Sequence, residues 1–324
     1  MKRVSSVRCR VSARILLVPW VAFVLSGCST PVPRPDSRPD AELVQLSKSA
    51  VQAFDIGAFD RAARFYELAL ERARRIDDGI EVAKNASNLA ACKIKAGKLE
   101  EAEPLLAEAK AEFTKWRKDS TGVTLLQAQI AKERGDMAGT AALLKDVLLW
   151  GGAKTESRLQ AYIMMADMAC DAGNRDEATV ALRKVNTLAG SVSEPALRGG
   201  AARVSGRVAL LKGNTAQAAA EFDREIAFLQ KAHRYREMAA ALDRAGAAWL
   251  ESGGEQQAAD RYYRAARSTY AQGDIVAALK SIDRAMDAAQ KAGDENLAAG
   301  ISALMGEISA AVKSAASQED APAP

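Results

Sequence analysis

Seven glycines recur along this chain at a nearly constant spacing, and this spacing constrains the fold more than any other feature of the sequence. The glycines are Gly57, Gly97, Gly135, Gly173, Gly213, Gly253 and Gly273. The steps between them are 38 or 40 residues long, except the last, which is 20. A fixed period in this range is typical of a repeat array, in which one small structural unit is stacked several times.

Three further positions keep their character in phase with the glycines. Seven residues before each glycine stands a small residue: Ala50, Ala90, Ala128, Ala166, Gly206, Gly246 and Ala266. Five residues after it stands another: Ala62, Ala102, Thr140, Ala178, Ala218, Ala258 and Ala278. Nine residues after it comes a bulky residue: Tyr66, Leu106, Leu144, Leu182, Phe222, Tyr262 and Ile282.

These offsets predict a helix that ends at the glycine, a tight turn and a second helix. Glycine suits the end of the first helix because it enters the left-handed conformation at low cost. The small residues let the two helices approach closely, and the bulky residues fill the space between neighbouring pairs. One pair buries only part of its apolar face, so the pairs must stack. No stretch shows sustained strand alternation, and the fold class we expect is all-α.

The repeated unit resembles the tetratricopeptide repeat (TPR) family. The family's second helix is similar to GAFDRAARFYELA at residues 57–69 and to GKLEEAEPLL at residues 97–106. The resemblance covers roughly residues 41–290. It implies an all-α, right-handed α-solenoid of about seven TPR-like helix pairs with a C-terminal capping helix.

The chain departs from the family pattern in its period, its prolines and one packing position. The period of 38–40 residues exceeds the usual 34, which predicts helices longer by about one turn. The family's proline between repeats is missing. The fifth repeat has Glu225 where good repeats have alanine, and is therefore degenerate. The final step of 20 predicts that a helix at 260–272 serves two pairs, and a helix at 296–312 caps the array.

The N-terminus has the composition of a targeting segment. Residues 1–14 are basic, residues 15–25 are apolar, and Leu25-Ser26-Gly27-Cys28 follows. An apolar run of this length is shorter than the roughly 20 residues that span a membrane, which indicates a secretory signal. The order of these parts resembles a bacterial lipoprotein. That resemblance implies cleavage after residue 27 and lipidation (palmitate) of Cys28. The alternatives are an uncleaved anchor or a simple signal peptide with an incidental cysteine.

The segments around the solenoid follow from this interpretation. In Gram-negative lipoproteins, an aspartate directly after the lipidated cysteine holds the protein in the inner membrane. This chain has Ser29 there, which predicts an outer-membrane protein that faces the periplasm. In another cell type, we expect a membrane-anchored protein outside the cytoplasm. Residues 28–40 are proline-rich and form a tether, residues 41–315 form the solenoid, and residues 316–324 form a tail. The net charge of +4 comes from the basic signal, so we expect no nucleic-acid partner.

The residue types that usually carry catalysis do not form a recognisable constellation. Cys92 and Cys170 lie two repeats apart, too far for a disulfide, and sit among alanines, so we interpret them as buried structural thiols. His233, the one histidine, falls between helices with no partner suggested by the sequence. We therefore predict no enzyme activity, no metal and no cofactor.

The first helices of the pairs should line a concave groove, the family's usual working surface. Positions three before and one after each small residue should face it: Ser47, Val51, Ser87, Ala91, Leu125, Gln129, Ile163, Asp167, Arg203, Arg207, Asp243, Ala247, Tyr263 and Arg267. Asn88 resembles the family asparagine that clamps a peptide backbone. The candidates for a basic end of the groove are Arg203, Arg207, Arg264 and Arg267, beside Tyr263. The alternative for these arginines is a solvated charged face.

The sequence therefore predicts a lipid-anchored periplasmic scaffold that binds a protein or peptide partner in an envelope assembly. Two other functions stay open. One is a groove that binds a small glycan or lipid, and the other is a non-catalytic regulatory subunit of an envelope enzyme. Fold-level similarity does not choose among them.

Overall fold

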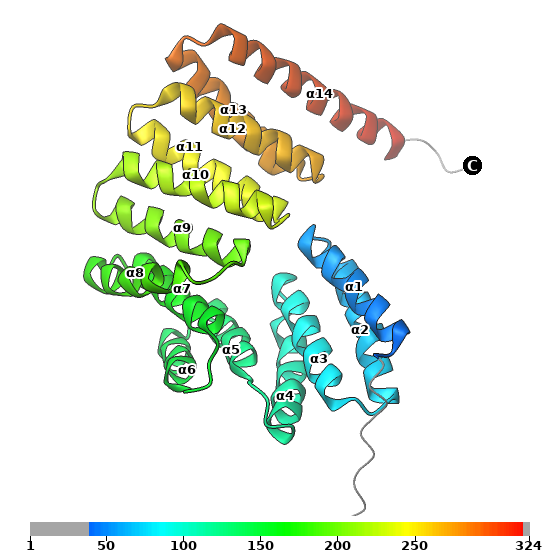
Figure 1. Cartoon of the computed structure of the whole chain (residues 1–324). Helices are drawn as coiled ribbons and strands as arrows, with labels where there is room; N and C mark the ends of the chain where they lie inside the picture. Colours follow the sequence, from blue (N-terminus) through cyan, green and yellow to red (C-terminus); the bar gives the residue numbers. More distant parts are fainter. Residues whose placement is uncertain (1–38, 320–324) are drawn as a thin grey trace, which may run out of the picture. The chain divides into compact units, whose positions relative to one another are not determined.

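The computed structural model describes residues 39–319, which contain fourteen α-helices and no strand. All fourteen helices belong to one compact unit of the chain, which begins at Asp40 (Figure 1). Their bounds are α1 Ala41–Asp55, α2 Phe59–Arg75, α3 Gly79–Lys95, α4 Leu99–Lys115, α5 Thr121–Glu133, α6 Met137–Leu149, α7 Thr155–Asp171, α8 Arg175–Ala189, α9 Pro195–Leu211, α10 Thr215–Lys231, α11 Tyr235–Glu251, α12 Glu255–Ala271, α13 Ile275–Ala292 and α14 Glu295–Glu319. The predicted signal peptide, Cys28 and most of the tether lie outside the described residues.

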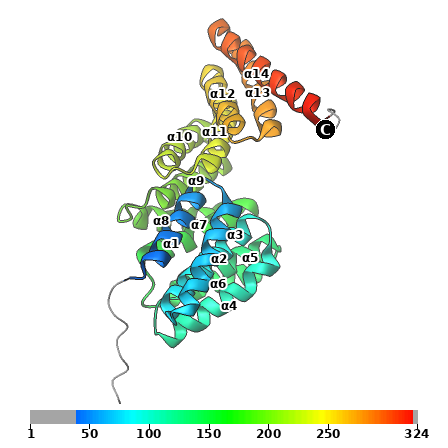
Figure 2. The ribbon, with the colours of Figure 1, turned by 90° about the vertical axis from the view of Figure 1, so that its right-hand side faces the viewer.

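Successive helices pack side by side in chain order, which confirms the predicted all-α solenoid of about seven pairs (Figures 1 and 2). We call the odd-numbered helices from α1 to α11 the first helices, because each opens a pair. Across residues 39–319, none of the helices is both long and apolar enough to cross a membrane.

The first six glycines of the ladder mark the turns within the pairs, as the spacing predicts. All seven glycines have φ between +68° and +81°. The turn after α1 shows the hydrogen bonds that this conformation allows: the Gly57 amide donates to the Phe54 carbonyl at 3.0 Å, and the Ala58 amide donates to the Ala53 carbonyl at 2.9 Å. These bonds satisfy carbonyls that would otherwise lack a partner at the helix end.

Three of the turns between pairs, those after α2, α4 and α10, reuse this geometry without glycine. Asp77, Arg117 and His233 have φ values of 53°, 51° and 56°. Each lies 20 residues after a ladder glycine and two residues after the end of a second helix. The underlying period of the backbone is therefore one helix and one turn. The last step of 20 arises because Gly273 occupies a turn between pairs, after α12.

The in-phase small and bulky residues form the contact between the helices of a pair. A Cβ placed on Gly246 of α11 would lie 2.8–3.0 Å from three ring atoms of Tyr262 on α12. A Cβ on Gly206 of α9 would lie 2.6–3.0 Å from the ring of Phe222 on α10. Both rings are buried, so glycine is required where the opposing residue is an aromatic ring packed this closely.

The C-terminal end of the array is closed by α14. Ile301, Leu304 and Ile308 of α14 are buried in one apolar cluster with residues of α12 and α13. Its opposite face carries exposed residues such as Glu307, as expected for a capping helix. The helix begins one residue before the predicted 296–312 segment and extends beyond its end, to Glu319.

The joint between α4 and α5 has the thinnest packing between any two successive helices among residues 39–319. The apolar cluster that spans α1–α4 continues into α5 only through Val123 and Ile130, with Leu126 packed against it. In addition, α5 and α6 have 13 residues each, whereas α3 and α4 have 17. A shorter helix buries less apolar surface against its neighbour, so this joint holds the first two pairs less firmly.

Candidate binding groove

A cavity of about 390 Å³ lies among the first helices. It is lined by residues of α1, α3, α5, α7, α9 and α11, and α10 contributes to one wall. Its polar and small lining residues include Ala91, Gln129, Gln160, Arg203, Glu225 and Arg244. The predicted groove positions Ala91, Gln129 and Arg203 thus face this cavity. Others do not, because Leu125 and Ile163 are buried in the apolar clusters between helices.

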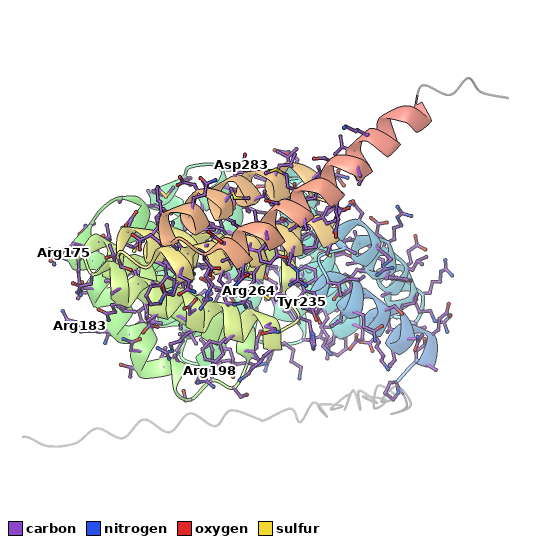
Figure 3. The ribbon with its side chains drawn as sticks, turned by 90° about the horizontal axis from the view of Figure 1, so that it is seen from above. Arg175, Arg183, Arg198, Tyr235, Arg264 and Asp283 are labelled. Carbon is purple, nitrogen blue, oxygen red and sulfur yellow. The ribbon has the colours of Figure 1, made fainter. Side chains whose placement is uncertain are left out.

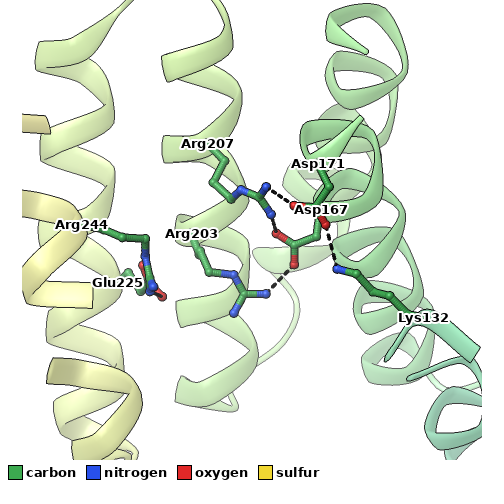
Figure 4. A network of polar contacts seen from close by, with 7 residues as sticks. All are labelled: Lys132, Asp167, Asp171, Arg203, Arg207, Glu225 and Arg244. Atoms are coloured by element: carbon green, nitrogen blue, oxygen red, sulfur yellow. Dashed lines mark hydrogen bonds and ion pairs between the residues drawn. The ribbon is translucent and has the colours of Figure 1, made fainter. Parts of the chain in front are cut away.

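Arg203 and Arg207 both bind one carboxylate on the preceding first helix. Arg203 Nη2 donates to Asp167 Oδ2 at 2.6 Å, and Arg207 Nη1 donates to Asp167 Oδ1 at 2.7 Å. Figure 4 shows the two guanidinium groups pointing from α9 toward α7. The two arginines are four residues apart, so they lie on one face of α9 and reach the same acid. Asp167 is only 6% exposed.

A second acid extends this network. Arg207 Nη2 donates to Asp171 Oδ1 at 2.5 Å, and Lys132 Nζ lies 3.0 Å from Asp171 Oδ2 (Figure 4). Burial alone would raise the pKa of Asp171, but the hydrogen bonds from Arg207 and Lys132 outweigh it and hold this pKa below its ordinary value. The charges of Arg203 and Arg207 are therefore largely compensated within the protein.

Glu225 is the most buried ionisable group of the cavity wall. It lies on α10, is 2% exposed, and its Oε1 accepts a hydrogen bond from Arg244 Nη2 at 2.7 Å. Glu225 Oε2 and Arg244 Nε are buried and have no hydrogen-bond partner among the described residues. Burial raises the pKa of the Glu225 carboxyl, while Arg244 and Arg203 lower it by a smaller amount. The residue that makes the fifth repeat degenerate is thus the one that brings a carboxylate to the cavity wall.

Two side-chain amides face the same cavity. Gln129 of α5 and Gln160 of α7 line it, and neither amide is hydrogen-bonded to another group within residues 39–319. Each amide offers a carbonyl acceptor and two N–H donors. Leu126 and Leu229 supply apolar surface nearby. The cavity therefore combines free hydrogen-bonding groups with apolar walls.

Asn88 and the predicted C-terminal residues lie elsewhere. Asn88 is exposed on α3 and does not line the cavity. The neighbouring Asn85 is buried instead, where its Nδ2 donates to the Glu81 carbonyl at 2.8 Å and its Oδ1 accepts from Ser47 Oγ at 3.2 Å. An asparagine in this position holds α1 and α3 together.

Tyr263, Arg264 and Arg267 lie on α12, a second helix. Tyr263 packs against the apolar cluster of α12–α14, and the Arg267 guanidinium lies 5.8 Å from its ring. Arg264 Nη1 lies 3.4 Å from Asp260 Oδ2 on the same helix. None of the three lines the cavity. The structure therefore brings Arg203 and Arg207 together and keeps the α12 residues in a separate place.

The two thiols and the histidine occupy structural positions. Burial raises the pKa of Cys92 to about 12 and also raises the pKa of Cys170. His233 Nδ1 lies 2.9 Å from Tyr235 Oη at the turn before α11. Among residues 39–319, no group of His, Cys, Asp and Glu side chains could hold a metal ion.

The comparisons with known proteins agree on the fold. No protein-family model matches the chain, and no curated protein matches it. Among solved structures, BtubC (BKLC) from P. vanneervenii is similar at 20% identity and a TM-score of 0.50, over 67% of this chain and 92% of BtubC. The APC/C hetero-tetramer Cut9–Hcn1 is similar at 12% identity and a TM-score of 0.50, over 82% of this chain and 48% of the matched chain.

A further similar structure contains a tetratricopeptide repeat sensor. It is the STAND signal transduction ATPase with a tetratricopeptide repeat sensor from Pyrococcus horikoshii, at 14% identity and a TM-score of 0.54, over 80% of this chain and 42% of that one. This chain therefore spans less than half the length of two of the three matched chains. Likeness at these identities shows the fold alone. The fold is that of an all-α helical solenoid, and it is similar to the fold of tetratricopeptide repeat structures.

Proposed function

We propose that the protein is a scaffold that binds an extended segment of a protein partner in the cavity among its first helices. The observation that carries this proposal is the pair of free amides, Gln129 and Gln160, beside apolar walls. An extended peptide has backbone N–H and C=O groups that need partners, and side-chain amides satisfy both kinds. A cavity of about 390 Å³ lies in the range that holds a small ligand or a few peptide residues.

The test uses a photo-crosslinking residue placed at position 129 or 160 of the full chain in cells. We expect a protein adduct from both positions. A residue placed at Val180, which is 54% exposed on α8, is the control and should give no such adduct. If positions 129 and 160 capture no protein while a small glycan or lipid copurifies, the alternative groove ligand replaces the peptide. The same protein adduct from position 180 would show that the capture is not specific to the groove.

Affinity provides a second test once a partner is captured. Gln129→Ala with Gln160→Ala should weaken binding about tenfold, because two hydrogen bonds contribute roughly 1 kcal/mol or less each. Gln127→Ala is the matched control: Gln127 lies on the same helix but does not line the cavity, and contacts Lys110. If the double variant and the control change the binding affinity equally, the Gln129 and Gln160 amides do not bind the partner.

We further propose that the protein is anchored by lipid on Cys28 in the outer membrane and faces the periplasm. The basic start, the apolar run of residues 15–25 and the Leu-Ser-Gly-Cys order support this location. Several acyl chains on one residue would hold it more firmly than a single chain. Cys28→Ala should move the protein from the membrane fraction to the soluble fraction, whereas Cys92→Ala should not. Unchanged sedimentation of the Cys28 variant would contradict the anchor.

A further inference from the structure

Two parts of the solenoid that are far apart in sequence meet beside the cavity. The Arg234 guanidinium lies 5.0 Å from the Phe54 ring, and its Nε lies 4.0 Å from Asp55 Oδ1. Lys95 Nζ lies 3.7 Å from Glu237 Oε1. We call these five residues the clasp. They join the ends of α1 and α3 to the start of α11.

A second contact lies next to the clasp. The Arg236 guanidinium lies 5.8 Å from the Phe59 ring, and its side chain approaches Gly57, where a Cβ would lie 3.7 Å from Arg236 Nε. Figure 3 places Tyr235, between these arginines in sequence, next to the ribbon of the N-terminal helices. A space of about 210 Å³ remains between the two sides. The two surfaces therefore touch without being fully packed.

The clasp contains no shared apolar core. The apolar cluster of α1–α4 ends at α5, and the clusters of α10–α14 do not include any residue of α1–α4. The clasp is held by cation–π contacts and by ion pairs of 3.7–4.0 Å between partly exposed side chains. Each contact of this kind shifts an equilibrium by only about two- to fivefold. The closed arrangement is thus weakly held.

The thin joint between α4 and α5 gives the first two pairs a place to move. Helices α1–α4 share one apolar cluster and should move as a body, while the apolar packing across the joint is limited to Val123, Leu126 and Ile130 of α5. The polar contacts across the joint are made by exposed side chains, chiefly Arg134 with Glu103 of α4, and such exposed ion pairs contribute little to stability. Val123 lies close to the linker that ends at Ser120. A rotation there would separate the clasp and open the cavity, because Phe54 and Lys95 line one side of it and Arg234 and Glu237 the other.

We propose that α1–α4 is a gate, that the clasp holds this gate closed over the groove, and that a partner segment enters when the clasp opens. This inference rests on the proposed function of the groove for its biological role, but the gate is a property of the protein alone. Because salt screens the ion pairs, higher ionic strength should favour the open gate. A partner that needs the open gate would then associate faster at higher salt, the reverse of electrostatic steering.

The closed gate can be measured with the native residues of the full chain, without a partner. A carbodiimide joins an amine to a nearby carboxylate, so Lys95 and Glu237 should be coupled, and mass spectrometry should find their peptides linked. The reference is the coupling of Lys132 to Asp171, a pair at 3.0 Å between neighbouring repeats. Between about 0.05 M and about 1 M salt, the Lys95–Glu237 yield should fall several-fold relative to the reference.

A substitution tests the same equilibrium without changing the coupled residues. Arg234→Ala removes the contacts with Phe54 and Asp55 across the clasp, together with the ion pair between Arg234 and Glu237 at the start of α11, and should lower the Lys95–Glu237 yield about two- to fivefold. Arg224→Ala is the control, since Arg224 binds Glu221 on its own helix and lies outside the clasp. A yield unaffected by salt and by Arg234→Ala would mean a rigid joint, and background yield at every salt concentration would mean that the two sides do not meet. Either result overturns the gate. The photo-crosslinks at positions 129 and 160 test separately whether the groove binds a protein partner.

Discussion

Replacing Gly246 by alanine tests the central packing rule of the array. The new methyl group would lie 2.8–3.0 Å from three ring atoms of Tyr262, well inside van der Waals contact. Tyr262 is only 4% exposed, and the Arg284 guanidinium lies 5.8 Å from its ring centroid. The ring is therefore enclosed, and it cannot swing away without disturbing α13.

The expected magnitude follows from two opposing effects. Overpacking a buried contact costs about 1–3 kcal/mol. Alanine improves helix propensity over glycine by about 1 kcal/mol. The net loss of unfolding free energy should be about 1 kcal/mol. Gly306→Ala is the matched control, because Gly306 is exposed within α14 and no atom lies within 4 Å of its Cβ position. That variant should gain up to about 1 kcal/mol.

The assay is urea unfolding followed by circular dichroism, with both variants compared with the wild type. Tyr262→Leu provides the decisive second step, since leucine occupies the equivalent position at Leu106 and Leu144. In the Tyr262→Leu background, Gly246→Ala should no longer destabilise, which would appear as a coupling energy of about 1 kcal/mol or more. If Gly246→Ala stabilises the wild type as much as Gly306→Ala does, the close contact is not what selects glycine.

Three further predictions follow from the turns and the buried groups. His233 holds φ 56°, so His233→Gly should raise the urea midpoint by an amount corresponding to about 1 kcal/mol, while Gly213→Ala at φ 77° should lower it similarly. Burial raises the pKa of the Glu225 carboxyl above its ordinary 4.5. The stability that Glu225 contributes is therefore full below pH 4.5 and is lost as the pH rises through the raised pKa of the folded protein. In melts at a series of pH values, the unfolding free energy of the wild type minus that of Glu225→Gln should fall over this range. Cys92 is 1% exposed with a pKa of about 12, so maleimide should label it only when urea unfolds α3, and labelling mapped to Cys92 by mass spectrometry in the native protein at neutral pH would contradict its burial.

The turns show how far a sequence pattern predicts this backbone. Glycine identifies the turns within the pairs because it adopts positive φ readily. The turns between pairs were harder to place, since Asp77, Arg117 and His233 adopt the same conformation at higher cost. A signal was present: each of these residues lies 20 positions after a ladder glycine. The final step of 20 between Gly253 and Gly273 reveals this half period directly.

The groove was predictable in position but not in charge. The repeat pattern places Arg203 on the inner face of α9, where the structure has it. It does not predict that Asp167 compensates it, because the acid lies 36 residues earlier on the preceding first helix. Glu225 was interpreted as a sign of a degenerate repeat. The repeat pattern describes which residue is usual at a position. Where glutamate replaces the usual alanine, the pattern does not predict where the glutamate side chain points.

Contacts between residues one repeat apart suggest a rule that would have predicted the ion pairs between Asp167 and the arginines of α9. Asp167 and Arg207 each follow the small residue of their first helix, and they bind each other across 40 residues. On the second helices, Asp223 of α10 and Arg261 of α12 pair across 38 residues, two fewer than the local period of 40. Stacking places equivalent positions of successive repeats side by side, so opposite charges at a separation of one period predict an ion pair. The clasp joins residues more than three periods apart, and its geometry depends on the small rotations that each joint adds. A sequence period does not fix those rotations, which is why the gate emerges only from the structure.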